Sequence, residues 1–512
     1  MTEPETPPGG PASTAIATEA YSGRRLGKEV LIYGLGVVAS RAASFIMLPV
    51  YTRLLTPADY GLLQMLEMTL DVAAILMSAG VVAGVMRFYF KATTDRERSE
   101  LLGSALLLQV GLNFLGTLLL CAGAWPIWRL GLRGAGAPTL VYIAAANFTL
   151  GVLNVVPLLQ MQMERKALAY SLATFSQVVV QLGLNILFLV IFRWGVLGIL
   201  LSTMLSSVVI GGATVGWMLR GTPLAWSRTA IHDLRRYGVP YQVATVATFI
   251  LTFGDRFFLQ AFGGLAVVGI YGLAYQFGFL LDSVAVAPFN RAWNPQRYQL
   301  VAQPREFRDA KYNQGFLYLS LLMMTTAVGI TVFVRPVLRL MSDAAFWPAA
   351  TIVPVVVAAY VVQSWSGVVQ FGINVSERTK YVSYAMWISV VAILALYTLL
   401  IPPFGAMGAA VATLIAFVVR FALIYRFSQR LWPVTYRWAA HAKLGASALL
   451  VTLAAFAFDL GGVVAQGLFG AGLLIVYLGL VWIGVLERED RRLLSDAIRL
   501  SPRSLFTRLA RS

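Results

Sequence analysis

The sequence predicts an all-α polytopic membrane protein with about 14 transmembrane helices, built as two parallel six-helix bundles plus two C-terminal helices. Three observations predict this fold class. Hydrophobic residues make up 58% of the chain and charged residues only 12%, whereas soluble globular proteins have about 25% charged residues. Apolar segments of about 20 residues recur along the chain. One sequence pattern also appears twice, about 210 residues apart.

Twelve of the apolar segments form two sets of six, and each is long enough for a helix that crosses roughly 30 Å of hydrocarbon. The first set lies near 28–51, 60–88, 101–125, 139–162, 171–193 and 195–219, and the second near 238–261, 268–290, 313–335, 350–372, 380–401 and 406–426. Two further segments, near 439–458 and 465–486, have no repeat partner. We therefore expect a disordered cytosolic tail at 1–27, six-helix bundles at 28–220 and 238–430, a cytosolic linker at 221–237, extra helices at 431–486 and a basic amphipathic tail at 487–512.

The internal repeat extends to residues that are unusual in an apolar helix. The matching segments are Tyr60-Gly61-Leu62 with Tyr271-Gly272-Leu273, Asp71 with Asp282, Glu164-Arg165 with Glu377-Arg378, and Gly195 to Gly198 with Gly405 to Gly408. Their offsets lie between 210 and 213 residues, and loop insertions and deletions account for such small drifts. Duplicated membrane domains with symmetry-related charges are typical of carriers.

The net charge of +17 is distributed unevenly over the predicted loops. Arg and Lys cluster at every second loop, and by the positive-inside rule this side faces the cytoplasm. Both termini then lie in the cytoplasm, and the two halves have the same orientation. This distribution argues against a nucleic-acid partner and indicates membrane lipids as the surroundings. The tail at 487–512 either lies on anionic lipid or is a solvated basic segment.

The sequence contains no combination of residues typical of an enzyme. His232, His441 and Cys121 are the chain's complete set of histidines and cysteines, which leaves no metal cluster and no nucleophile with a base. A glycine-rich phosphate loop and a D-x-D pair are also missing from the sequence. We therefore expect neither an enzyme nor a protein with a bound cofactor or metal.

Ionisable groups within the predicted spans are the candidate site, because each charge near the bilayer centre costs about 2.5–3.5 kcal/mol on insertion scales. The candidates are Arg41, Gln64, Glu67, Asp71, Asp255, Arg256 and Asp282, in which Gln64 is a polar neighbour of the charges. Position 252, the repeat counterpart of Arg41, lies one helical turn before Arg256. Two interpretations remain open: these groups form buried ion pairs that fix helix packing, or they line a central hydrophilic cavity.

Two segments of the chain resemble a known family. The run from Arg41 to Gly61 (RAASFIMLPVYTRLLTPADYG) resembles the start of the polysaccharide transporter family of oligosaccharide flippases, in the multidrug/oligosaccharidyl-lipid/polysaccharide (MOP) exporter superfamily. Asp255 to Leu259, followed by Gly269 to Tyr275, resembles its second-half counterpart. The resemblance implies two six-helix bundles that face each other across a central cavity, with the last two helices packed outside.

The resemblance also implies a function in the bacterial cytoplasmic membrane. Such proteins move an undecaprenyl-diphosphate-linked oligosaccharide to the outer leaflet by alternating access, for cell-surface polysaccharide biosynthesis. A polysaccharide polymerase and a chain-length regulator are the partners it suggests. We expect Arg41 and Arg256 to face the diphosphate, while Asp71 and Asp282 hold these arginines or exchange H+ or Na+. Membrane potential is the alternative source of energy.

Three other functions remain open at this point. One is a multidrug or organic-cation antiporter of the same superfamily, in which carboxylates dominate the cavity, and another is a lipid II-type flippase. A scaffold for envelope assembly that transports nothing belongs to a different class, and it predicts that the charges in the spans can be replaced without loss of function.

Overall fold

The computed structural model describes residues 47–78, 80–487 and 491, which form helices joined by short loops. Arg41, the rest of the first predicted span up to residue 46, and most of both tails lie outside these residues. The described residues fall into two compact units. Unit 1 comprises residues 47–54 and 66–246, and unit 2 comprises residues 55–65 and 247–491.

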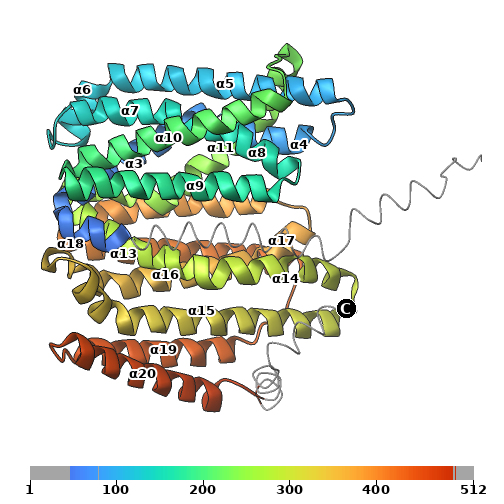
Figure 1. The fold of residues 1–512 in the computed structure, drawn as a ribbon. Helices are drawn as coiled ribbons and strands as arrows, with labels where there is room; N and C mark the ends of the chain where they lie inside the picture. The colour runs from blue at the N-terminus through green and yellow to red at the C-terminus, as the bar shows by residue number, and fades with distance from the viewer. Residues whose placement is uncertain (1–46, 79, 488–490, 492–512) are drawn as a thin grey trace, which may run out of the picture. The chain divides into compact units, whose positions relative to one another are not determined.

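Unit 1 is a bundle of long apolar helices, several of which lie side by side in Figure 1. Its elements are α4 (Val81–Phe88), α5 (Asp95–Ala122), α6 (Ala124–Pro126), η1 (Ile127–Gly131), α7 (Thr139–Gly151), η2 (Val152–Asn154), α8 (Val155–Met163), α9 (Ala167–Asn185), η3 (Ile186–Ile191) and α10 (Gly195–Gly221), together with most of α3 (Pro57–Met77) and most of α11 (Arg228–Phe253). Buried Val85, Ala105, Val156 and Leu234 join α4, α5, α8 and α11 in one apolar cluster. Because α11 begins at Arg228, only residues 222–227 of the expected linker are non-helical.

Local sequence explains where these helices begin and end. The hydroxyl of Thr94 accepts a hydrogen bond from the backbone N–H of Glu97, and the Glu97 carboxylate accepts one from the Thr94 N–H, which is the reciprocal cap that starts α5. The segment 60–88, which we expected to be one span, is divided into α3 and α4. Gly80 is the residue just before α4 and has a φ of 62°. A Cβ at this position would lie 2.3 Å from the Cα of Gly238. Both the left-handed backbone and this close approach require glycine.

Unit 2 contains the second half of the repeat and the last two helices. Its elements are α12 (Asp255–Gly263), α13 (Leu265–Leu281), η4 (Asp282–Val286), α14 (Ala287–Gln299), η5 (Leu300–Ala302), α15 (Arg305–Met341), η6 (Ala344–Phe346), α16 (Ala349–Val369), α17 (Phe371–Val375), α18 (Lys380–Leu431), α19 (Trp438–Ala457) and α20 (Val463–Gly484). Gly405, with φ of 54° and ψ of −129°, divides α18 into two helices. The start of α3 packs against α13, since a Cβ on Gly61 would lie 1.9 Å from the carbonyl oxygen of Leu265.

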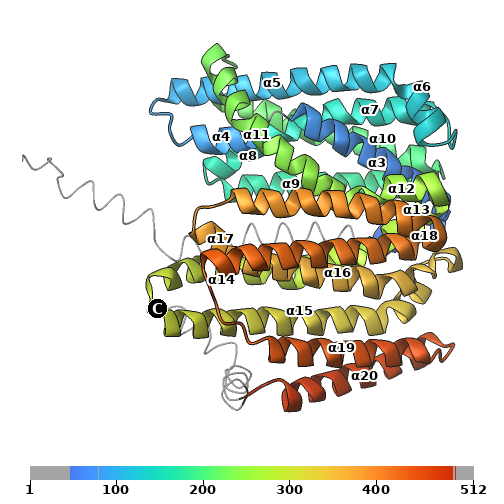
Figure 2. The same ribbon diagram turned by 180° about the vertical axis from the view of Figure 1, so that it is seen from behind.

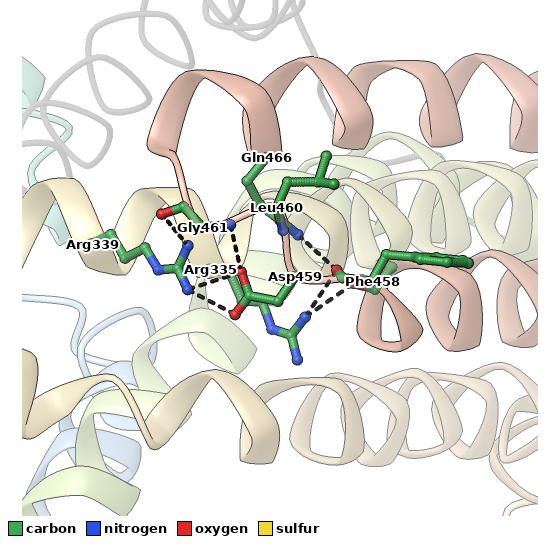
Figure 3. Close-up of polar contacts among 8 residues, drawn as sticks. Arg335, Arg339, Phe458, Asp459, Leu460, Gly461 and Gln466 are labelled. Carbon is green, nitrogen blue, oxygen red and sulfur yellow. Dashed lines mark hydrogen bonds and ion pairs between the residues drawn. The ribbon is translucent and has the colours of Figure 1, made fainter.

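Helices α19 and α20 pack against α15, as both ribbon views show (Figures 1 and 2). Buried Val328, Leu444 and Tyr477 belong to their common apolar cluster. At one end, two arginines of α15 hold the loop between α19 and α20 (Figure 3). Arg339 donates to both carboxylate oxygens of Asp459 at 3.0 and 2.8 Å, and Arg335 donates to the carbonyl oxygen of Ala455 at 3.2 Å.

Eleven helices in the described residues are long and apolar enough to cross a membrane. This number counts α18 once, and the first predicted span lies almost entirely outside the described residues. An all-helical membrane fold is therefore confirmed, whereas the total of about 14 spans stays a prediction.

The internal repeat is visible in the backbone of the two units. Gly195 in unit 1 has φ of 55° and Gly405 in unit 2 has φ of 54°. Arg165 and Glu377, which follow equivalent helices, both have φ of 56°. Such angles are uncommon for residues other than glycine, so their recurrence near an offset of 210 residues supports the duplication that the sequence indicated.

Candidate functional site

The centre of the candidate site in unit 2 is a buried ion pair between consecutive residues. Asp255 and Arg256 open α12, and their exposed fractions are 0% and 1%. The Arg256 Nη1 atom lies 2.7 Å from Asp255 Oδ1 and also donates to the carbonyl oxygen of Thr252 at 3.0 Å. Burying two charges is favourable only when the geometry of the pair is good and further hydrogen bonds satisfy the remaining polar atoms of both side chains.

Two tyrosines of α13 supply those further interactions. Tyr271 donates its hydroxyl hydrogen to Asp255 Oδ2 at 2.5 Å, so both carboxylate oxygens are engaged. The guanidinium carbon of Arg256 lies 4.2 Å from the ring centroid of Tyr275 and 5.0 Å from that of Phe253, within the range of cation–π attraction. The pair therefore has little net charge to offer a ligand in this arrangement.

More tyrosines surround this pair. The ring centroid of Tyr360, on α16, lies 6.0 Å from that of Tyr275, and the Tyr397 and Thr413 hydroxyls of α18 are 3.4 Å apart. The Tyr360 hydroxyl has no hydrogen-bond partner within the described part of the chain. Sequence reasoning missed the role of these tyrosines. The available signal was Tyr271 and Tyr275, one turn apart in an apolar segment that closely follows the Asp-Arg pair.

The predicted carboxylates of the spans have a different environment from Asp255. Glu67 and Asp71 lie one turn apart on the part of α3 that belongs to unit 1, and both are exposed. Asp282 of unit 2 is exposed as well and begins η4, a π-helix. Single π-helical turns often mark functional sites, and charges exposed on membrane helices usually face water or a partner group and not lipid.

Gln64, the remaining predicted site residue that the structure describes, belongs to unit 2 and is 8% exposed. A Cβ on Gly272 would lie 3.2 Å from its Cγ, so Gln64 packs against α13. The structure thus brings Asp255 together with Arg256, Glu67 together with Asp71, and Gln64 next to α13. The role of all these residues in binding stays a prediction, and Arg41 lies outside the described residues.

Arg420 is a charged residue of a span that sequence reasoning overlooked. It lies in the second half of α18 on the same helical stripe as buried Ala416 and Ile424, and its own side chain is partly buried. Among the described residues, its Nε atom has no hydrogen-bond partner and no carboxylate pairs with the guanidinium. The signal was present in the sequence, because Arg420 interrupts the apolar run from Gly408 to Ile424. An ionisable group at such a position is a functional candidate.

In the described part of the chain, no group of three or more His, Cys, Asp or Glu side chains is placed to hold a metal ion. Fixed guanidinium groups can attract an anion, and exposed carboxylates can take up a proton or a cation.

Comparison with known proteins places the chain in a family. A family model described as "Polysaccharide biosynthesis protein" matches residues 26–300, more than half of the 512 residues. The chain belongs to this family. A search of curated proteins found no match.

Solved structures of the MOP superfamily share the fold of this polysaccharide biosynthesis protein. The lipid II flippase MurJ in an inward closed conformation is 12% identical with a TM-score of 0.73, over 88% of this chain and 99% of MurJ. An inward-facing multidrug resistance MATE family transporter is 14% identical with a TM-score of 0.60, over 76% and 94%. A MOP superfamily transporter from Pyrococcus furiosus is 16% identical with a TM-score of 0.51, over 79% and 95%. The chain is thus a multi-pass membrane protein of the polysaccharide biosynthesis protein family, and its fold is that of these solved transporters.

Proposed function

We propose that this protein is a flippase that translocates a lipid-linked oligosaccharide across the bacterial cytoplasmic membrane by alternating access, for cell-surface polysaccharide biosynthesis. The family match over residues 26–300 is the observation that carries the proposal. The lipid carrier is undecaprenyl diphosphate in this proposal, both termini lie in the cytoplasm, and a polymerase and a chain-length regulator are the partners. The six-helix bundles at 28–220 and 238–430 are the two halves that alternate.

The substrate's diphosphate requires cations inside the protein, and the arginines of the spans supply them. Arg256 is neutralised by Asp255 at 2.7 Å, so it contributes a fixed dipole unless the pair opens. Arg420 has no carboxylate partner in the part of the chain that the structure describes, and its planar guanidinium can bind phosphate oxygens bidentately. We therefore add Arg420 to Arg41 as a phosphate-facing residue. Asp71 and Asp282 are the groups that exchange H+ or Na+ if an ion is coupled.

The decisive test is translocation by variants that fold normally. Purified wild-type protein in vesicles should move a fluorescent undecaprenyl-diphosphate oligosaccharide between leaflets, and Arg420→Gln should slow this movement about tenfold or more, because a hydrogen bond to a charged group contributes about 1.5–3 kcal/mol.

Arg426→Gln is the matched control, since Arg426 is exposed on the same helix six residues later. We expect it to behave like wild type in vesicles and in a strain that lacks its own flippase. If Arg420→Gln also behaves like wild type in both, Arg420 does not bind the substrate. If wild-type protein moves lipid II and ignores oligosaccharide diphosphates, the substrate is that of a lipid II-type flippase.

A cation antiporter is the second candidate, and the exposed carboxylates Glu67, Asp71 and Asp282 favour it. An antiporter should accumulate an organic cation in vesicles when a proton or Na+ gradient is imposed, and Asp71→Asn should abolish this uptake. A scaffold without transport activity would tolerate both Asp71→Asn and Arg420→Gln in the complementation assay.

A further inference from the structure

Unit 1 contains a polar pocket away from the charged residues of the spans. It lies where the end of α8 meets the end of α10, has a volume of about 360 Å³, and is lined by Gln160, Glu164, Lys166, Trp217, Met218, Arg220 and Gly221. This volume is at the lower end of the range for ligand sites, about 300–1,000 Å³. The pocket is therefore large enough for a headgroup and too small for a whole oligosaccharide.

The wall of the pocket is organised by one acidic side chain. Glu164 accepts a hydrogen bond from Gln160 Nε2 at 2.6 Å and pairs with Lys166 Nζ at 2.6 Å. Gln160 Nε2 also donates to the Thr222 hydroxyl at 2.8 Å. Arg165, with φ of 56°, holds the tight turn that places Glu164 and Lys166 on the same side. These contacts fix the positions of the polar side chains, so the wall of the pocket is ordered without a ligand.

The pocket also contains polar groups whose hydrogen-bonding or ion-pairing positions are not filled by other described residues. Gln160 is 3% exposed, and its Oε1 atom has no donor among the described residues. Arg220 is exposed and has no carboxylate partner in the described part of the chain. Because Glu164 is already engaged, the excess charge of the lining is positive. The Lys166 ammonium lies 4.8 Å from the ring centroid of Trp217, which orients this indole.

The equivalent place in unit 2 is filled, although the sequence repeat extends to it. Gln160 corresponds to Gly372, which is buried, because the left-handed residues Arg165 and Glu377 at the ends of the equivalent helices are 212 residues apart. The ring centroids of Phe371 and Trp432 lie 5.6 Å apart there, and a Cβ on Gly372 would be 2.3 Å from Ser428 Oγ. The duplication has thus kept an open polar pocket in unit 1 and an aromatic core in unit 2.

We propose that this pocket of unit 1 binds a phosphate ester whose alcohol part carries free hydroxyl groups. Arg220 and Lys166 attract the phosphate, since guanidinium and ammonium groups form strong charge-assisted hydrogen bonds with its oxygens. A ligand hydroxyl supplies a donor for the acceptors Glu164 and Gln160. Trp217 is of the residue type that is enriched where a membrane meets water. Two molecules share this chemistry: the glycerol phosphate headgroup of an anionic phospholipid, and a soluble glycerol phosphate or sugar phosphate.

Binding to the full-length protein in detergent tests the proposal without any translocation step, so its outcome is independent of the proposed function. The probes are short-chain phosphatidylglycerol, short-chain phosphatidylcholine and glycerol 3-phosphate. Phosphatidylglycerol should bind wild-type protein at least about tenfold more tightly than phosphatidylcholine, which has neither net negative charge nor free hydroxyls. Arg220→Gln should weaken the binding of phosphatidylglycerol or of glycerol 3-phosphate by a similar factor.

Arg228→Gln is the matched control, because Arg228 is an exposed arginine of unit 1 outside the pocket. It should bind every probe like wild type. Binding of phosphatidylglycerol alone identifies the lipid as the ligand, and binding of glycerol 3-phosphate identifies the soluble source. The proposal is overturned if Arg220→Gln and Arg228→Gln bind equally well, or if phosphatidylcholine binds as tightly as phosphatidylglycerol.

Discussion

Asp255 and Arg256 are consecutive residues, and each makes the burial of the other possible. Replacing one partner leaves the other as an uncompensated buried charge, which typically costs about 3–5 kcal/mol. We expect Arg256→Met to lower the free energy of unfolding by about this amount. The double variant with Asp255→Leu should lose less than Arg256→Met alone, because no buried charge remains. Unfolding of the purified proteins in detergent measures both changes, and equal or larger loss in the double variant would contradict the pairing.

Sequence reasoning identified the charged residues and could not identify their partners. A charge in an apolar segment can be recognised from the sequence alone, and on that basis Asp255 and Arg256 were selected. The structure shows that both are buried. Their environment depends on Tyr275, about 20 residues later, and on Tyr360, more than 100 residues later, which only the packing of α12, α13 and α16 brings together. Arg420 was visible in the same way and was missed because it has no charged counterpart in the first half.

The contact between α3 and α13 depends on two glycines. A Cβ on Gly61 would lie 1.9 Å from the Leu265 carbonyl oxygen, and one on Gly269 would lie 2.0 Å from the Pro57 carbonyl oxygen. Overpacking of this kind costs about 1–3 kcal/mol, so Gly61→Ala should lower the melting temperature of the purified protein. Gly329→Ala is the control, since nothing lies within 4 Å of its added Cβ, and its better helix propensity should leave stability unchanged or higher.

A second interaction between elements should depend on pH. Hydrogen bonds from the backbone N–H of Gly461 and then from Arg339 hold the pKa of Asp459 below its ordinary value. Because the folded-state pKa is the lower one, this contact stabilises the protein above the unfolded pKa of about 3.9 and loses its effect as the pH falls through the folded pKa. We expect Asp459→Asn to melt slightly below wild type at pH 7, and the difference to shrink as the pH falls below about 4.

The control for the pH experiment is Glu306→Gln, which removes an exposed carboxylate at the start of α15 without touching the loop between α19 and α20. It should melt like wild type at both pH 7 and pH 3. A difference between Asp459→Asn and wild type that persists unchanged at pH 3 would show that this contact does not act through the charge of Asp459.

Hydrophobicity predicted the helices well and their interruptions poorly. The segments near 101–125 and 195–219 correspond to α5 and α10, because an apolar run of sufficient length has few alternatives to a helix in lipid. The break at Gly80 and the π-helix at Asp282 were not predicted. Gly80 approaches Gly238, and hydropathy carries no information about such contacts. Gly405 was flagged by the repeat, although its positive φ was not.

For the whole molecule, the repeat was the most informative part of the sequence. It predicted two halves, and Gly195 and Gly405 confirm the correspondence at the level of backbone angles. It could not predict that residues 55–65 belong to the second unit, since the Gly61 contact with Leu265 depends on packing that a repeat does not encode. The same symmetry explains why differences between the halves matter, because a difference such as Gln160 against Gly372 is visible only when the two halves are aligned.

The source of energy for translocation is also a property of the whole molecule. The Asp255–Arg256 pair has no net charge, so it does not neutralise a diphosphate that moves past it. An anion that leaves a negative cytoplasm gains about 2.3 kcal/mol per charge at 100 mV, equivalent to about fiftyfold in its distribution between leaflets. We therefore expect an imposed potassium diffusion potential, negative on the cytoplasmic side, to drive net flipping in vesicles without a proton or Na+ gradient.

Reversing the sign of this potential should reverse the direction of net flipping, and removing it should leave slow equilibration. Arg420 provides an internal check, because a guanidinium that moves with the diphosphate would mask part of its charge. In that case the residual flipping by Arg420→Gln should depend more steeply on the potential than flipping by wild type, even though its rate is lower. If wild-type flipping ignores the potential and requires a proton or Na+ gradient, then an ion exchanged at the exposed carboxylates Asp71 and Asp282 supplies the energy instead.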